Sequence, residues 1–261
     1  MNTTQIIEIA GMFFIPLLAV LIPIILGQRY GIYRSKKTED TQQTPVGTVV
    51  GSTFGLLAFM LAFTFQIVTN RYDTRKELLV EEVTTIRTTY LRAGLIPEEY
   101  CTETRKLLIE YVDLRVALAK DLSKLNSVKW RSEQILDTLW NFSEKLGELD
   151  RSSENYALFI SSVNAMVDYY NQRITMALEF RIPAVILWAL MIITFFAMFA
   201  LGYQFGISGK GSFRINLLLG IIFAVVMFLI LILDRPETGI AKVNQKPMFT
   251  LQNQLHGDVL K

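Results

Sequence analysis

The segment Val46–Thr69 reads VGTVVGSTFGLLAFMLAFTFQIVT and has the length and composition of a helix that crosses a bilayer. At about 100° per residue, one face of this helix carries small or polar side chains, apart from two phenylalanines. We call this face the stripe, and it consists of Thr48, Ser52, Gly55, Phe59, Ala62, Phe63, Gln66 and Asn70. The other side of the helix is rich in leucine, isoleucine, valine, methionine and phenylalanine, which suit lipid or packed helices.

The stripe has two interpretations, a pore lining and a packing seam. If the helix extends past the membrane, Asp73, Glu77 and Glu81 lie on the same azimuth as the stripe. A pore-lining helix that widens into an acidic vestibule has this pattern. A seam between tightly packed helices has a similar one, because Gly, Ala and Ser let membrane helices approach closely.

Individual residues of the stripe have matching roles in the pore interpretation. Phe59 and Phe63 lie one turn apart and are the candidate hydrophobic neck, while Gln66 and Asn70 meet ions below it. In the alternative, the rings pack between helices and the amides form interhelical hydrogen bonds. The acidic residues then pair with nearby basic side chains instead of attracting cations. Those basic residues are Arg71, Arg75, Lys76 and Arg87.

Hydropathy along the whole chain predicts an all-α membrane protein. Four stretches are long enough to span a bilayer, which needs about 20 apolar residues in a helix. They cover about residues 6–26, 46–69, 183–206 and 215–233. The first stretch lacks a basic segment before it and a small-residue cleavage site after it, so we read it as a retained span rather than a signal peptide.

The predicted domains follow from these spans. Residues 1–69 form the first transmembrane pair, residues 70–182 a helical extramembrane domain, residues 183–233 the second pair, and residues 234–261 a tail. Within the first pair, residues 27–44 are expected to form a polar loop. The middle domain is expected to extend the second span to about Ala93.

Three further helices are predicted in the middle domain, at about 98–124, at about 130–146 with a stop at Gly147, and from about 152 onward. The last of these is expected to run directly into the third span at Pro183. The tail reads as extended chain with a short final helix.

Composition excludes several classes of function. The chain has 26 Lys and Arg residues against 24 Asp and Glu residues, and no block is basic enough to indicate nucleic-acid binding. It has one cysteine, Cys101, and one histidine, His256, so zinc ligand sets and Ser–His–Asp triads are nearly excluded. We therefore expect no catalytic residue, no metal site and no cofactor, and the bilayer itself as a partner.

Several motifs are shared with a known family. The segment from Leu56 to Glu98 holds an apolar run, an RYD–R core, a Glu-Glu pair, a Tyr-Leu-Arg triplet and a Leu-x-Pro stop. These positions are Phe63, Arg71, Tyr72, Asp73, Arg75, Glu81, Glu82, Tyr90, Leu91, Arg92, Leu95 and Pro97. EYVDLR at Glu110–Arg115 and LDRPETG at Leu233–Gly239 match as well. The chain thus resembles the bestrophin-like domain family over nearly its whole length.

That family is distantly similar to true bestrophins, which are pentameric ion channels with a pore lined by the second span. The resemblance implies a homo-oligomer, a pentamer by analogy, that carries small inorganic ions. It also implies a helical body and both termini in the cytoplasm, on the inner membrane of a cell. The chain departs from bestrophins after Asp73, where tryptophans are missing, and at Ala241–Val243, where an acidic run is missing. Calcium gating by that route is not implied.

Charge alone does not decide the orientation, because basic residues flank the spans in similar numbers on both sides, and the first span argues for the reverse arrangement. The leading prediction is an oligomeric ion channel with a modest preference for monovalent cations. The alternative is a membrane-anchored helical scaffold or signalling protein that does not conduct.

Overall fold

The computed structural model describes residues 3–37, 46–178, 180–209, 212–235 and 241–259, and everything regular in them is helical. The chain divides into two compact units. Residues 1–72 and 181–241 form the first, which we call the membrane unit. Residues 73–180 and 242–261 form the second, which we call the helical unit.

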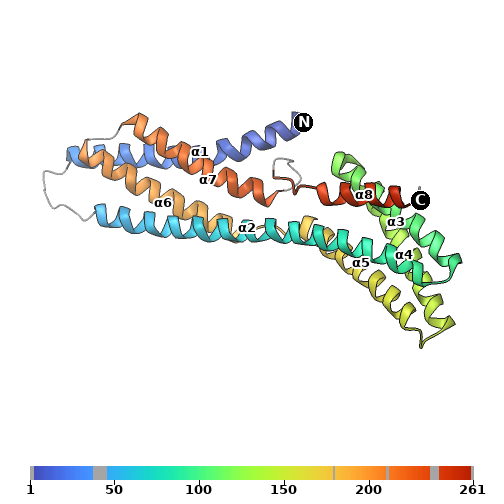
Figure 1. Cartoon of the computed structure of the whole chain (residues 1–261). Coiled ribbons are helices and arrows are strands. Elements are labelled where there is room, and N and C mark those ends of the chain that lie inside the picture. The colour runs from blue at the N-terminus through green and yellow to red at the C-terminus, as the bar shows by residue number, and fades with distance from the viewer. Residues whose placement is uncertain (1–2, 38–45, 179, 210–211, 236–240, 260–261) are drawn as a thin grey trace. The chain divides into compact units, whose positions relative to one another are not determined.

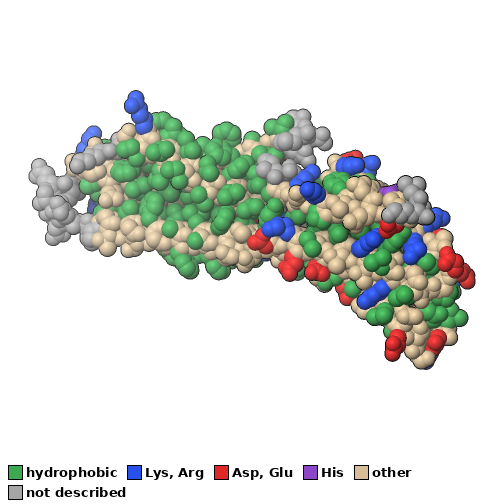
Figure 2. All heavy atoms as spheres, viewed as in Figure 1, with side chains coloured by type: hydrophobic (Ala, Val, Ile, Leu, Met, Phe, Trp, Pro, Cys, Tyr) green, Lys and Arg blue, Asp and Glu red, His purple; other side chains and the backbone are tan. Residues whose placement is uncertain are grey.

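The membrane unit contains α1 (Thr3–Lys37), the first part of α2 (Val46–Arg92), α6 (Ala184–Ser208) and α7 (Phe213–Asp234) (Figure 1). Each is long and apolar enough to cross a membrane. Hydrophobic side chains cover the surface of these helices, whereas charged side chains gather on the helices of the other unit (Figure 2). The prediction of an all-α protein with four spans is confirmed, and the chain is a multi-pass membrane protein.

The first span is longer than predicted. The helix α1 continues through Gly27 to Lys37, so the expected polar loop from residue 27 is wrong for residues 27–37, and residues 38–45 lie outside the described part of the chain. Arg29 and Arg34 are exposed, and long cationic side chains tolerate the end of a membrane helix because their charged heads reach water. Gly27 and Gly31 also pack this part of α1 against α6.

The contact between α1 and α6 is made backbone to backbone. A Cβ added at Gly27 would lie 2.1 Å from the carbonyl oxygen of Phe199, and one added at Gly202 would lie 2.1 Å from that of Ile24. A Cβ added at Gly31 or Gly206 would also lie well under 3.0 Å from the facing backbone. Only glycine permits this approach, so the membrane unit has a small-residue seam between α1 and α6.

The buried core of the membrane unit draws on all of its spans. Helix α2 contributes Leu57 and Val68, while the other spans contribute the larger share. The other buried residues of this core are Val20, Ile24, Leu190, Ala197, Met198, Phe223, Met227 and Ile230, together with Ile182 just before α6. The core therefore lies on one side of α2 only.

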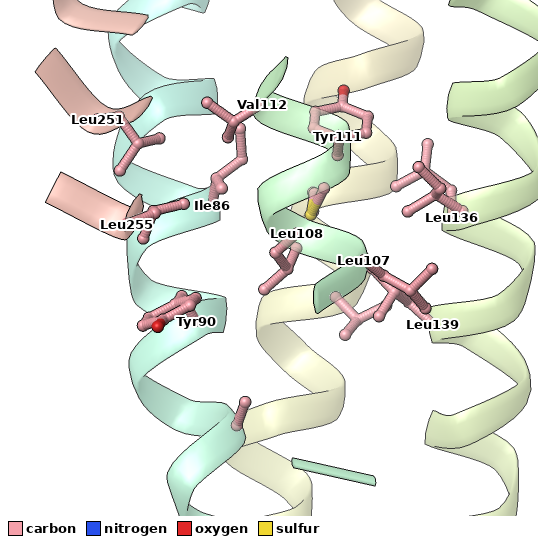
Figure 3. Close-up of a cluster of buried hydrophobic side chains, with 14 of the residues drawn as sticks. Ile86, Tyr90, Leu107, Leu108, Tyr111, Val112, Leu136, Leu139, Leu251 and Leu255 are labelled. Carbon is pink, nitrogen blue, oxygen red and sulfur yellow. The ribbon is translucent and has the colours of Figure 1, made fainter. Parts of the chain in front are cut away.

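The helical unit comprises the second part of α2, η1 (Ala93–Leu95), α3 (Glu98–Lys120), η2 (Leu122–Lys124), α4 (Leu125–Leu149), α5 (Glu154–Leu178) and α8 (Lys246–Val259). Ile86 and Tyr90 of α2, Leu108 and Tyr111 of α3, and Leu255 of α8 meet in its core (Figure 3). The short helix expected near the C-terminus is thus α8, and it packs into the core of the helical unit.

Other helix boundaries differ from the predictions: α3 ends at Lys120 rather than about 124, and α4 begins at Leu125 rather than about 130. Helix α5 ends at Leu178 and residues 180–183 are not helical, so the expected run of α5 into the third span is wrong. Proline has no N–H and disfavours helical backbone in the residue before it, which explains the break at Ile182–Pro183. Helix α4 passes through Gly147 and ends at Leu149. By contrast, α2 continues without interruption from Val46 to Arg92, as predicted.

Candidate functional site

Every residue of the stripe is exposed on the single chain. The residues that α2 buries in the membrane unit are Val50, Leu57, Thr64 and Val68. At 100° per residue, the centre of the stripe lies about 180° from the centre of this buried set. The stripe is therefore part of the surface of α2 that is not packed within its own chain, a surface that also includes Val49, Leu56 and Phe65.

The surroundings of Gly55 help to distinguish the pore-lining interpretation of the stripe from the packing-seam interpretation. No atom lies within 4 Å of a Cβ built at Gly55, whereas the α1–α6 glycines touch the facing backbone. The small residues of the stripe are thus not a packing seam within one chain, as far as the described residues extend. A packing seam between different copies of the chain remains an alternative interpretation of the stripe.

Phe59 and Phe63 project from the stripe rather than into the core. Their side chains are 65% and 50% exposed. Their ring centroids are 6.5 Å apart with an interplanar angle of 13°, so the rings stack on each other along the helix. Packing of these rings between helices of the same chain is not what the structure shows.

Gln66 and Asn70 continue the stripe below the rings. Gln66 Nε2 donates a hydrogen bond to Asn70 Oδ1 at 2.6 Å, one turn away. This bond lies within α2, so it differs from the interhelical bond considered as an alternative. Both side chains stay exposed, and they present amide groups on the same face as the rings.

The acidic residues that follow on α2 belong to the helical unit and have different surroundings. Asp73 pairs with Lys76 at 3.0 Å, and both side chains are more than half exposed. Glu81 accepts a hydrogen bond from the Tyr169 hydroxyl at 3.4 Å, and the charge of Glu81 raises the pKa of Tyr169. Glu77 is exposed and has no ion-pair partner among the described residues. The alternative of ion pairing is therefore met for Asp73.

Arg71 and Arg87 do not pair with those acids as considered in the alternative. Arg87 bonds to Asp258 of α8 at 2.7 Å. Arg71 Nη1 lies 3.2 Å from Asp234 Oδ1, at the end of α7. The same oxygen accepts a hydrogen bond from the backbone N–H of Ile182 at 3.0 Å.

Sequence reasoning missed the Asp234 site. The signal that could have found it is a lone acid at the end of an apolar span, because a buried carboxylate needs a cation or an N–H donor. Which of the many arginines would supply the partner is not visible in the sequence.

Residues 13–248 match the family model described as Bestrophin-like domain. The chain belongs to this family. No curated protein sequence matches it.

Solved structures of a bacterial bestrophin homologue from Klebsiella pneumoniae share the fold of this bestrophin-like chain. One point mutant matches with a TM-score of 0.66 at 17% identity, covering 97% of this chain and 100% of that chain. Another matches with a TM-score of 0.64 at 15% identity, covering 92% and 97%. The form phased with zinc matches with a TM-score of 0.59 at 16% identity and 95% coverage of both chains. At these identities the likeness concerns the fold alone.

The second acid of the Glu-Glu pair is buried in the helical unit of the bestrophin-like chain. The Tyr111 hydroxyl donates to Glu82 Oε1 at 2.8 Å, Arg115 Nε lies 3.5 Å from the same oxygen, and Arg173 pairs with Oε2. Burial raises the pKa of Tyr111 and lowers the pKa of Arg115. This cluster ties α2, α3 and α5 together, and the sequence did not reveal it because its members are far apart in the chain.

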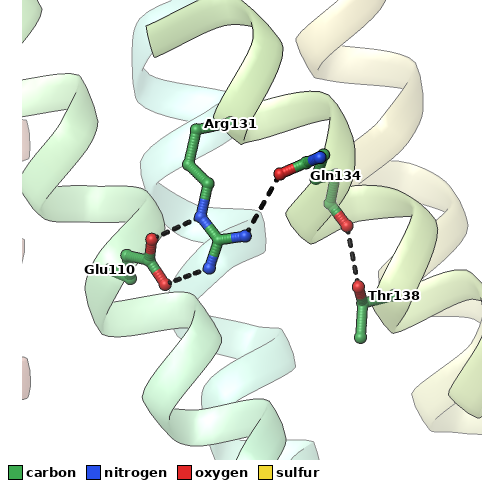
Figure 4. Close-up of polar contacts among 4 residues, drawn as sticks. All are labelled: Glu110, Arg131, Gln134 and Thr138. Carbon is green, nitrogen blue, oxygen red and sulfur yellow. Dashed lines mark hydrogen bonds and ion pairs between the residues drawn. The ribbon is translucent and has the colours of Figure 1, made fainter. Parts of the chain in front are cut away.

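The EYVDLR motif holds α3 against α4. Glu110 accepts two hydrogen bonds from Arg131, at 2.6 Å and 2.8 Å, and Arg131 also donates to Gln134 (Figure 4). The hydrogen bond from Arg131 lowers the pKa of Glu110. Motif residues that the family resemblance drew attention to thus have a structural role here.

The remaining reactive residues have ordinary surroundings. Cys101 is free and buried, and His256 Nε2 lies 3.0 Å from Asp113 Oδ1. The described residues contain no cluster of three or more His, Cys, Asp or Glu side chains placed to hold a metal ion. Glu8 is exposed near the start of α1. The part of the tail motif from Pro236 to Gly239 lies outside the described residues.

Proposed function

We propose that this bestrophin-like protein is an oligomeric ion channel in which the stripe of α2 surrounds the pore. The observation that carries the proposal is the position of the stripe, opposite the packed face of α2 and exposed on the single chain. A face directed at lipid gains from large apolar side chains, whereas this one carries Ser, Gly, Ala, Gln and Asn. Small and polar side chains of this kind suit contact with the water of a pore.

The ion path follows from the order of residues along α2. Phe59 and Phe63 form the neck, where an apolar ring excludes water and ions. Ser52, Gly55 and Ala62 line the pore with little side-chain volume, and Gln66 and Asn70 offer polar groups below the neck. Asp73, Glu77 and Glu81 follow as vestibule residues that favour monovalent cations over chloride.

A pore of this kind needs several copies of the chain, because each contributes a single α2. We propose a homo-oligomer, a pentamer by analogy with bestrophins, seated in the inner membrane with the helical unit and both termini in the cytoplasm. Its partners are the lipid bilayer and small inorganic ions. Neither catalysis nor a cofactor enters the proposal.

Ion flux through liposomes tests the neck. Phe59→Ala and Phe63→Ala are each expected to raise flux, because removing the ring widens the apolar constriction. Phe65→Ala is the matched control, since Phe65 is an exposed phenylalanine of the same helix outside the stripe. Unchanged flux in both neck variants, with assembly intact by mass measurement in detergent, would remove these residues from the pore.

The competing function is a membrane-anchored scaffold that does not conduct. The helical unit exposes large apolar side chains, including Trp130, Leu149 and Leu91, which a partner protein would cover. A wild-type protein that assembles but passes no ion, or one that remains a monomer, would favour this function over the channel.

A further inference from the structure

The carboxylate of Asp234 joins three parts of the membrane unit. It lies at the last residue of α7, bonds to Arg71 of α2, and accepts the backbone N–H of Ile182, just before α6. Asp234 is only 8% exposed. A carboxylate so little exposed to solvent needs these partners, because an unpaired buried charge is strongly unfavourable. The contact is therefore specific rather than a solvated surface pair.

The position of Arg71 on α2 determines which face of the helix the ion pair with Asp234 holds. Arg71 directly follows Asn70, the last residue of the stripe, but at 100° per residue it falls on the packed face with Leu57, Thr64 and Val68. Asp234 therefore holds α2 by its packed side at the level where the stripe ends. Any rotation of α2 about its own axis must break or stretch this ion pair.

In the rotation that the pair permits, the stripe with Phe59 and Phe63 faces directly away from the packed core. We propose that Asp234 is a positioning residue that, through Arg71, keeps α2 in the rotation that turns the two phenylalanines toward the pore and so keeps the neck closed. The inference rests on the proposed channel function and assigns a role to an acid outside the pore.

Single-channel recording tests the inference with Asp234→Asn. The amide oxygen still accepts from Ile182, but the charge that holds Arg71 is lost. Because a hydrogen bond to a charged group contributes a factor of about ten or more, we expect open probability to rise about tenfold. Unitary conductance is expected to stay unchanged, since no pore-lining residue is altered. Glu8→Gln is the matched control, because Glu8 is an exposed acid of the same unit with no assigned role.

A double-mutant cycle shows whether Asp234 acts through Arg71. Arg71→Gln is expected to reproduce the change of Asp234→Asn, and the double variant is expected to add nothing further. Additive effects, or an assembled Asp234→Asn variant with unchanged or reduced open probability, would overturn the inference. A purely structural role would lower the unfolding temperature without changing open probability.

Cysteine labelling gives a readout that does not depend on conduction. In a Cys101→Ala background, the single cysteine of Thr64→Cys replaces a side chain that is 0% exposed on the packed face of α2. Asp234→Asn is expected to speed the labelling of this cysteine, because α2 is then free to rotate, whereas Glu8→Gln is expected to leave the rate unchanged. An unchanged rate in Asp234→Asn would refute the positioning role. A silent wild type with a faster labelling rate in Asp234→Asn would refute the channel and retain the control of rotation.

Discussion

Three acids on α2 illustrate how neighbours decide what a carboxylate does. Glu82 is buried with two arginines and a tyrosine, Asp73 shares an exposed pair with Lys76, and Glu77 faces solvent. They lie on one helix within ten residues of sequence. Among the proposed vestibule acids, Lys76 neutralises Asp73 in part, so the proposed effect on a permeant ion rests mainly on Glu77 and Glu81.

Replacing Glu77 and Glu81 together by Gln is expected to move the reversal potential in a salt gradient toward the anion side. The two carboxylates repeat in every copy of the chain, so their removal lowers the negative potential near the pore. The shift is expected to shrink in high salt, where the Debye length falls to about 3 Å at 1 M. Glu99→Gln is the control, since Glu99 is an exposed acid on α3. An unmoved reversal potential would show that these carboxylates do not act on the ion path.

The pair of Glu110 and Arg131 predicts a dependence of stability on pH. Arg131 lowers the pKa of Glu110 in the folded chain below its usual 4.5. A lowered folded pKa contributes stability that is present above 4.5 and lost as the pH falls through the folded pKa. Both side chains are 39% exposed, so the contribution is expected to stay below about 1 kcal/mol.

Thermal unfolding in detergent measures this effect. Glu110→Gln is expected to lower the unfolding temperature near neutral pH, and the difference from the wild type is expected to vanish in acid. Glu99→Gln serves as the control with no paired arginine among the described residues. An equal difference at all pH values would show that Glu110 contributes through packing and not through its charge.

At the scale of helices, the glycines of α1 and α6 have different surroundings from Gly55 of α2. The glycines of α1 and α6 bring two backbones into contact, whereas Gly55 of α2 faces open space. All of them read alike in the sequence, as small residues within apolar helices. What distinguishes them is the presence of a facing helix.

The substitutions Gly202→Ala and Gly55→Ala are expected to have opposite effects on the unfolding temperature. The new Cβ at Gly202 would meet the Ile24 carbonyl oxygen at 2.1 Å, so α1 and α6 must separate at a cost of about 1–3 kcal/mol. The new Cβ at Gly55 has room, and alanine favours the helix by about 0.5–1 kcal/mol.

Assembly measured alongside unfolding separates the two interpretations of the stripe. If Gly55→Ala keeps the wild-type oligomer, the stripe does not form a tight contact between copies. If it disrupts the oligomer as severely as Gly202→Ala disrupts the fold, the stripe is a packing seam between subunits and the pore assignment of Gly55 fails.

For the whole molecule, the two compact units differ in composition. One unit is apolar and consists of the spans, while the other is a helical bundle with ordinary charged surfaces. With the four candidate spans of the described residues, both ends of this sequence would lie on the same side of the membrane. The proposed cytoplasmic side follows from the family, whereas the charge flanking the first span favours the reverse.

The orientation is tested by labelling from one side. A reporter fused after Lys261 is expected to be cytoplasmic. A cysteine introduced in the segment from Ser35 to Thr44, with Cys101 replaced, is expected to react with an impermeant thiol reagent added outside. The reverse pattern would show that the charges flanking the first span set the orientation.

The sequence alone was enough for the features that depend on local composition. Hydropathy located the four spans, periodicity located the stripe, and the helical propensity between the second and third spans predicted α3, α4 and α5, because each depends on residues within about one helix length. The continuity of α2 through Asn70 was also predictable, since no proline or glycine lies between Gly55 and Gly94. Family membership rested on motifs readable in order along the chain.

Only the tertiary structure decided which residues meet. The partner of Arg71 is Asp234, at 163 positions' separation, and the cluster around Glu82 joins three helices. The same is true of the stripe, which became an unpacked face only once the opposite side of α2 was seen buried. Periodicity defines the azimuth of a side chain on its helix, but the identity of what lies opposite depends on how distant helices pack, and the sequence pattern carries no record of that pairing.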